Sequence, residues 1–264
     1  MKKRIAVIAD VHGNLEALKV TLNDIKKREI DTIYCLGDIV GKGNHPRECI
    51  DLVFENCKII LKGNLEEHIT KKNYSQDNKR DVFFAGQLDD EYIKKINGLP
   101  FCYEIYMSGS LIRFLHASPT SVYDKLPNST LLEEKIKAFY PTSNTISDQM
   151  ADIVIYADNH VQSLDRLYNR TLINVGSVGN STNIIRDETL DANVMETTQS
   201  FYLILTGDFD SKEYNSSLSY EFIRLPYDID KELVGSDNLV DRKLYLDELK
   251  KGKYKINPRR MPEK

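Results

Sequence analysis

Residues 4–14 read RIAVIADVHGN, and this stretch sets both the fold class and the position of a candidate site. The apolar run over residues 5–9 predicts a short buried strand that ends at Asp10. Leucine and isoleucine side chains then recur at helical spacing over residues 15–25, which predicts an amphipathic helix directly after the strand. A strand that runs through a polar turn into a helix is typical of α/β folds.

The same arrangement repeats along the next fifty residues. DTIYCLGD (31–38) predicts a second buried strand, HPRECIDLVFEN (45–56) a second helix and CKIILKGN (57–64) a third strand. This β-α-β-α-β order predicts parallel strands with right-handed crossovers. Asp10, Asp38 and Asn64 should therefore leave the same edge of one sheet, where open α/β sheets bind their ligands.

The rest of the chain predicts a second sheet. Residues 66–100 have a polar, helical pattern, and the stretch over 130–150 is also predicted to be helical. Strand-like runs occupy 102–107, 110–116, 152–160, 163–169, 170–180, 200–208 and 217–227. The later strands of this series, separated by turns, predict a second sheet that faces the first.

A charged tail follows, with a weak helical stripe formed by Leu239, Leu246 and Leu249. We interpret it as a surface helix. The predicted organisation is one domain over residues 1–230 and a C-terminal helical extension over 231–264.

Composition narrows the class of protein. The chain has 264 residues, a hydrophobic fraction of 41% and a formal charge of −4, so it predicts a sizeable core and no electrostatic footprint for polymeric nucleic acid. No run approaches the roughly 20 apolar residues of a membrane helix. The four cysteines are scattered, without the short paired spacings of zinc sites, which favours a reduced, cytoplasmic protein.

Five strand-like runs end in side chains that bind metals or phosphates. Each alone has an ordinary explanation, because Asp and Asn are favoured in turns and as helix caps. Their joint order is the signal. Three of the five histidines fall in it, whereas His45 is interpreted as a rim residue. The candidates are Asp10 and His12, Asp38, Asn64, His116, and Asp158 and His160.

This series, D-x-H, G-D-x-x-x-x-G, G-N, H-x-S-P and a final histidine, resembles the calcineurin-like metallophosphoesterases. It is most similar to their short-chain bacterial phosphodiesterase branch, which also shows NVGSVGN, found here at residues 174–180. Over residues 4–226 the resemblance implies an α/β four-layer sandwich of two mixed β-sheets flanked by helices. It also implies two divalent or trivalent transition-metal ions, such as manganese, iron or zinc, at the sheet edge.

The resemblance implies a role for each candidate ligand. Asp10, His12 and His160 would hold one ion. Asp38 would bridge both ions, and Asn64 and His116 would hold the other. Carboxylate, imidazole and amide groups suit such ions, and a shared carboxylate suits a two-metal site that activates a bridging water as the nucleophile.

Two positions depart from the family pattern. Asp158 stands where relatives commonly have a histidine that binds the second metal, and an aspartate there favours a harder cation such as manganese or iron. Leu65 stands where many relatives have the histidine that protonates the leaving group, which favours leaving groups that need little acid help. His68, one helical turn beyond Asn64, is the candidate acid, and a solvated histidine on a helix face is the alternative.

Further residues are candidates for contact with substrate. Gly13 and Asn14 open the first predicted helix, whose amides can meet a phosphate, although Asn14 also suits a plain N-cap. Gly176 and Gly179 predict a tight turn near the metals. Three basic residues, Lys42, Arg113 and Arg186, are not distinguished by the sequence from solvated charges.

The predicted function is metal-dependent hydrolysis of a small phosphodiester or a phosphoanhydride such as a dinucleoside polyphosphate. The expected partner is therefore a small phosphorylated or nucleotide substrate, not a membrane, and homo-oligomer formation stays open. One alternative is a catalytically impaired scaffold of the same fold that acts as a binding protein, like the retromer subunit that resembles this branch, and Asp158 favours it. Another alternative is a protein phosphatase. The retained set of inward-pointing polar ligands favours the enzyme, because a scaffold has no need to bury them.

Overall fold

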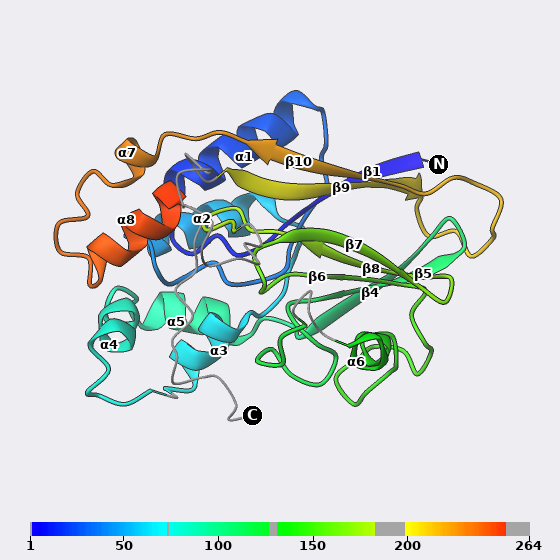
Figure 1. Cartoon of the computed structure of the whole chain (residues 1–264), viewed down its shortest axis with the longest axis horizontal. Helices are drawn as coiled ribbons and strands as arrows, with labels where there is room; N and C mark the ends of the chain where they lie inside the picture. The colour runs from blue at the N-terminus through cyan, green and yellow to red at the C-terminus, as the bar shows by residue number, and fades with distance from the viewer. Residues whose placement is uncertain (1, 73, 127–130, 183–198, 252–264) are drawn as a thin grey trace.

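Two five-stranded β-sheets lie face to face, with helices on their outer sides (Figure 1). The computed structural model describes residues 2–72, 74–126, 131–182 and 199–251. The strand order is β10-β9-β1-β2-β3 in the first sheet and β4-β5-β6-β8-β7 in the second. Both sheets contain parallel and antiparallel pairs, so the predicted architecture of two mixed sheets flanked by helices is confirmed.

The first sheet begins with the predicted β-α-β-α-β unit. Strands β1 (Lys2–Ile8), β2 (Ile33–Cys35) and β3 (Ile59–Ile60) are parallel, with Ala6 opposite Ile33 and Tyr34 opposite Ile59. The crossovers are helices α1 (Leu15–Lys27) and α2 (Pro46–Asn56). The carboxyl ends of β1, β2 and β3 therefore share one edge of the sheet.

The prediction that the late strands all join the second sheet is wrong for two of them. Strand β9 (Ser200–Asp208) pairs antiparallel with β1, and β10 (Ser219–Leu225) pairs antiparallel with β9. Both strands thus complete the first sheet. A continuous apolar run such as that of β9 identifies a strand buried on both faces, but it carries no information about which sheet that strand enters.

The second sheet is built from the middle of the chain. Its strands are β4 (Cys102–Met107), β5 (Ser110–Leu115), β6 (Ile153–Tyr156), β7 (Gln162–Leu167) and β8 (Arg170–Val175). Strand β6 lies parallel to both β5 and β8, and the outer pairs are antiparallel. The carboxyl ends of β5 and β6 therefore point the same way and bring their following residues together.

The helical part of the middle of the chain is shorter than the sequence predicts in one place. The polar middle region forms α3 (Asn64–Thr70), α4 (Lys79–Gly86) and α5 (Asp90–Asn97). Of the predicted helix over 130–150, only α6 (Leu132–Lys137) is helical, and residue 130 lies outside the described residues. Pro141 follows closely and cannot continue a helix, and the Thr142 hydroxyl donates to the Pro119 carbonyl.

Three apolar clusters separate the layers. One lies between the two sheets and includes Val7, Phe114 and Ile155, a second lies between the first sheet and its helices, and a third lies between the second sheet and α6. Together they make four layers of secondary structure around packed interiors. The four cysteines are free thiols, and no helix in the described part of the chain is long and apolar enough to cross a membrane.

The C-terminal extension is more than a surface helix, contrary to the sequence-based interpretation. It forms α7 (Ile229–Glu232) and α8 (Arg242–Lys251), which lie at the same end of the molecule as α2 and α4 (Figure 1). Tyr245 and Leu249 of α8 are buried in the same cluster as α1 and α2. The sequence shows only a weak stripe because a single face of this short helix carries the packing.

Candidate metal centre

All seven predicted metal ligands lie together at one edge where the two sheets meet. The first sheet supplies Asp10 and His12 after β1, Asp38 after β2 and Asn64 at the start of α3. The second sheet supplies His116 after β5, and Asp158 and His160 after β6. The charged and imidazole members of this cluster are all at most 5% exposed. The cluster is thus a buried polar group formed by residues up to 150 positions apart.

The backbone bends sharply at five of these residues. The φ angles of Asp10, His12, Asp38, Asp158 and His160 are 52°, 54°, 51°, 64° and 61°. Residues other than glycine are uncommon in this left-handed region, and they persist there only when the surroundings enforce it. Such bends after a strand end turn consecutive side chains towards one point.

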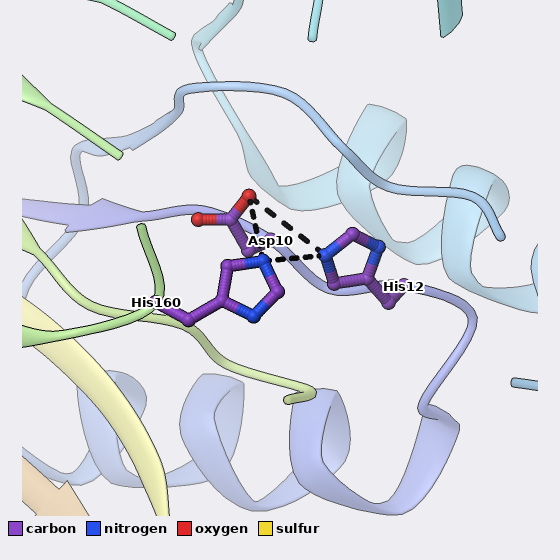
Figure 2. Close-up of side chains that lie close together, drawn as sticks. All are labelled: Asp10, His12 and His160. Carbon is purple, nitrogen blue, oxygen red and sulfur yellow. Dashed lines mark hydrogen bonds and ion pairs between the residues drawn. The ribbon is translucent and has the colours of Figure 1, made fainter. Parts of the chain in front are cut away.

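The first group consists of Asp10, His12 and His160 (Figure 2). His12 Nε2 lies 2.9 Å from His160 Nε2, and Asp10 Oδ1 lies 3.9 Å and 3.7 Å from these two nitrogens. His12 Nδ1 lies 3.3 Å from the Val40 carbonyl, and His160 Nδ1 lies 2.6 Å from that of Asn180. Each Nδ1 therefore donates its proton to a carbonyl, and each Nε2 presents a lone pair.

Two lone pairs that face each other need a cation. Burial, helped by the neighbouring imidazole and by Lys42, holds the pKa of His12 well below its usual value, and burial with Lys42 does the same for the pKa of His160. Both rings are therefore neutral at pH 7 and do not share a proton. Imidazoles oriented by carbonyls in this way are typical metal ligands.

The second group lies beside the first and contains Asp38, Asn64, His116 and Asp158. His116 Nε2 lies 3.5 Å from Asp38 Oδ1 and 3.8 Å from Asp158 Oδ1, and His116 Nδ1 lies 2.8 Å from the Leu36 carbonyl. The inward end of the Asn64 amide lies 3.0 Å from His116 Nε2, 3.1 Å from Asp38 Oδ2 and 3.2 Å from Asp158 Oδ1. The other oxygen of Asp38, Oδ2, lies 3.9 Å from His12 Nε2, so its carboxylate stands between the two groups.

Asp158 points into the cluster. Its backbone amide donates to Asp10 Oδ2 at 3.1 Å, and its Oδ1 accepts from Lys125 Nζ at 3.0 Å. Its other oxygen, Oδ2, and Asp10 Oδ1 are buried without a hydrogen-bond partner among the described residues. Buried carboxylate oxygens are costly to leave unpaired, so these two atoms mark places that suit a cation.

The carboxylates repel one another. Burial, with Asp38 and Asp158 close by, raises the pKa of Asp10 well above its usual value. Burial, with Asp158 beside it, raises the pKa of Asp38 to about 7. A bound cation would remove this strain by supplying the missing positive charge. The donor set of carboxylates, neutral imidazoles and an amide fits transition-metal ions, and Asp10 lies close enough to share a metal site with His12 and His160 or with Asp38 and His116.

Glu66 holds the Asp38 loop and was missed at the sequence level. It is fully buried in α3, and its carboxylate accepts from the backbone amides of Asp38 (2.8 Å), Ile39 (2.7 Å), Val40 (3.3 Å) and Gly63 (2.9 Å). The Glu66 side chain thus fixes both the loop that carries Asp38 and the backbone of Gly63, the residue before Asn64. The signal in the sequence is the position of Glu66 as the third residue of a helix, because a glutamate there often accepts hydrogen bonds from backbone amides at the helix start.

The segment 174–180 holds the backbone of Asp10 through hydrogen bonds. Ser177 Oγ donates to the Asp10 carbonyl at 2.8 Å, and the Gly179 amide donates to the same oxygen at 3.0 Å. Gly179 must be glycine, because a Cβ atom there would collide with the Val11 carbonyl oxygen. The predicted turn therefore holds the backbone of Asp10, the first candidate ligand, in place.

Other predicted site residues have protein partners. His68 Nε2 lies 2.8 Å from Asp81 Oδ2, and its role as acid stays a prediction. The Gly13 amide donates to the Ile39 carbonyl, and Asn14 Oδ1 caps α1 by accepting from Ala17, as the alternative reading of Asn14 expects. The preceding amide of α1, that of Glu16, donates to Glu232 Oε2 at 3.1 Å. This end of α1 is therefore occupied by a carboxylate of the protein itself.

The three basic residues considered as substrate contacts differ in their surroundings. Arg113 is buried and bonds Glu104 and three backbone carbonyls, so its role is structural. Lys42 is buried close to the cluster, where its charge acts on His12 and His160. Arg186 lies outside the described residues.

Comparison with known proteins identifies the class. The family model for calcineurin-like phosphoesterases matches residues 3–160, which is more than half of the chain, and the protein belongs to that family. Its sequence is 38% identical over 124 residues to an uncharacterized protein of Methanocaldococcus jannaschii, a match that covers 45% of this chain. The chain spans about half the length of that curated relative, 51% of it.

Solved structures agree on the fold. A metallophosphoesterase from Sphaerobacter thermophilus superposes with a TM-score of 0.67 at 22% identity, covering 94% of this chain and 99% of its own. A hypothetical protein from Pyrococcus horikoshii superposes with a TM-score of 0.73 at 17% identity, covering 95% and 99%. At these identities the likeness concerns the fold alone.

Proposed function

We propose that this protein is a metal-dependent hydrolase of small phosphodiesters or phosphoanhydrides, such as dinucleoside polyphosphates. The observation that carries the proposal is the paired set of lone-pair donors, with His12 Nε2 and His160 Nε2 at 2.9 Å and two unpartnered carboxylate oxygens beside them. Such a buried arrangement is unfavourable without cations. Family membership supports phosphoester chemistry at this edge of the sheets.

The two groups of residues would hold two ions. Asp10, His12 and His160 would bind one, and Asn64, His116 and Asp158 the other, with Asp38 between them. When bound, such ions neutralise charge on a phosphate group and make a water molecule a stronger nucleophile. The protein fixes the orientation of the ligands through the three carbonyls that accept from the imidazole Nδ1 atoms.

The environment of Leu65 supports substrates with good leaving groups. Its backbone amide donates to Asp38 Oδ1 at 2.9 Å, and its side chain packs against the apolar cluster of the first sheet. Leu65 therefore positions a ligand but has no proton to give. Phosphoanhydrides and activated phosphodiesters need little acid assistance, because their leaving groups are weak bases.

The test is hydrolysis of bis(4-nitrophenyl) phosphate and of diadenosine tetraphosphate with manganese, iron, zinc or magnesium, alongside elemental analysis. We expect close to two ions per chain and turnover with at least one transition metal. His160→Ala should lower turnover at least about a hundredfold, since even changes behind a ligand typically cost ~10–100-fold. His45→Gln is the matched control, because His45 contacts Glu48 outside the cluster.

If the protein binds no metal and shows no turnover with any of the four metals, the proposal that it is an enzyme is wrong. It would favour the scaffold alternative, to which the negative charge of Asp158 already points.

A further inference from the structure

A buried lysine links the metal centre to the C-terminal extension. Lys42 lies in the loop that follows Asp38, with a left-handed φ of 61°, and only 6% of it is exposed. Its Nζ donates to Asn180 Oδ1 at 2.5 Å and to Glu248 Oε2 at 3.2 Å. A buried ammonium group needs such partners, because desolvation without them is costly.

The counter-charge comes from the far end of the chain. Glu248 lies in α8, 206 residues beyond Lys42, and is itself only 6% exposed. Its Oε2 also accepts from Asn180 Nδ2 at 3.3 Å. Helix α8 is held in place by buried Tyr245 and Leu249, so the carboxylate is delivered by packed structure.

Asn180 connects this ion pair to a metal ligand. Both ends of its side-chain amide are engaged, the oxygen by Lys42 and the nitrogen by Glu248. Its backbone carbonyl accepts from His160 Nδ1 at 2.6 Å. The ion pair therefore clamps the residue that sets the tautomer and orientation of the His160 imidazole.

Stability alone is a weak reason for this pair. Replacing a buried ion pair by apolar residues of similar volume is often neutral or stabilising, so a gain in stability does not by itself explain this pair. The extension also reaches the start of α1, where Glu232 accepts from the Glu16 amide two residues after Asn14. Glu232 thus contacts the first turn of α1, whereas Glu248 contacts the loop residue Lys42 and Asn180.

We propose that Glu248 is a positioning residue for His160, acting through Lys42 and Asn180, and that α8 is a required part of the metal centre. The inference rests on the proposed metal site. It makes the C-terminal extension part of the metal site, although the family model matches only residues 3–160.

The experiment compares the full chain with its Glu248→Gln variant. Manganese binding to the metal-free proteins is measured by calorimetry, and the ¹⁵N shifts of the His160 imidazole report its tautomer, assigned with His160→Gln. We expect affinity at the first site to fall about 10- to 100-fold, the range for changes behind a metal ligand, and the Nδ1–H tautomer of His160 to become mixed. Lys250→Gln is the matched control, since it removes the exposed ion pair of α8 with Asp230.

A double variant, Lys42→Met with Glu248→Met, separates positioning from charge neutralisation. Because it buries no charge, it should fold even where Glu248→Gln does not. The proposal expects weak manganese binding in it, since the Asn180 amide loses both partners. Restored affinity in the double variant, or unchanged affinity and tautomer in Glu248→Gln, would overturn the inference while the proposed function stands. Failure of the unmodified chain to bind manganese would instead remove the proposed function.

Discussion

Three aspartates crowd the centre at the scale of single residues. Asp10, Asp38 and Asp158 are buried close together, and burial, with the neighbouring carboxylates, raises the pKa values of Asp10 and Asp38. Asp158 adds charge where relatives are expected to have a neutral imidazole. The metal-free centre is therefore under electrostatic strain, and a cation relieves it.

The charge of Asp158 should lower the stability of the metal-free protein and strengthen metal binding. We expect Asp158→Asn to raise the free energy of unfolding of the metal-free protein by roughly 1 kcal/mol, the equivalent of about one pKa unit, because repulsion on Asp10 and Asp38 falls. The same change, and Asp158→Ala, should reduce bound manganese from two ions towards one and lower phosphodiester hydrolysis more than folding. Denaturant unfolding and elemental analysis measure both effects. A stable variant that keeps two ions would show that Asp158 is not a ligand.

Lys125 competes with a cation for Asp158. Its Nζ lies 3.0 Å from Asp158 Oδ1, and the lysine side chain is 54% exposed, so solvent screens the pair. We expect Lys125→Met to tighten manganese binding at the second site by about two- to fivefold, in keeping with exposed ion pairs of ~0.2–1 kcal/mol. Calorimetry measures the affinity, and Lys125→Arg serves as the charge-retaining control. Weaker binding in Lys125→Met would contradict this account.

At the scale of elements, α3 organises the second group of ligands. It opens with Asn64, its second residue donates to Asp38, and its third, Glu66, accepts from four backbone amides. The first turn of one short helix therefore joins the ends of β2 and β3. Such a helix gains its stability from these tertiary bonds, because seven residues are too few for an isolated helix.

Removal of the Glu66 charge should loosen this joint. We expect Glu66→Gln to lower the free energy of unfolding by about 2–3 kcal/mol, since an amide side chain leaves buried backbone N–H groups without acceptors. Denaturant unfolding of the metal-free protein is the measurement. Glu67→Gln is the neighbouring control, because Glu67 pairs with Lys62 and Lys71 at the surface and should cost less than about 1 kcal/mol. Equal losses in the two variants would refute the special role of Glu66.

At the scale of the whole molecule, the centre joins the two sheets. The first sheet supplies four of the seven candidate ligands and the second supplies three. A bound ion would therefore cross-link the sheets at their common edge, and any ligand that binds only the folded state adds to its stability.

Metal binding should depend on pH in a defined direction. Burial raises the pKa of Asp38 to about 7 and raises the pKa of Asp10 well above its usual value, so in the metal-free protein both carboxyls hold protons at higher pH than an exposed aspartate does. The histidines have lowered pKa values and stay neutral there. Because a metal ion would bind the deprotonated carboxylates, the apparent affinity should rise as the pH increases from 5 to 7.

Calorimetry in buffers of different ionisation enthalpy would count the protons released. At least one should leave per centre at pH 6, and fewer at pH 8. Affinity that falls between pH 5 and pH 7 would contradict the raised carboxyl pKa values.

The amino-acid sequence by itself determined the strands and most of the helices, and the order of the polar residues that follow the strands. The reason is that strand and helix periods, turn residues and crossover handedness are local properties. Asp10, Asp38 and Asn64 were expected at one edge from these rules alone. The roles of His116, Asp158 and His160 came from family resemblance, and their metal-binding roles stay predictions.

Only the tertiary structure decided the long-range contacts. It placed β9 and β10 in the first sheet, reduced the predicted helix over 130–150 to α6 and buried α8. It also brought Glu66 to the Asp38 loop, Lys125 to Asp158 and Glu248 to Lys42. A lone charged residue carries no sequence signal for a partner far away in the chain, because its choice of partner depends on packing that forms only when the sheets and helices assemble.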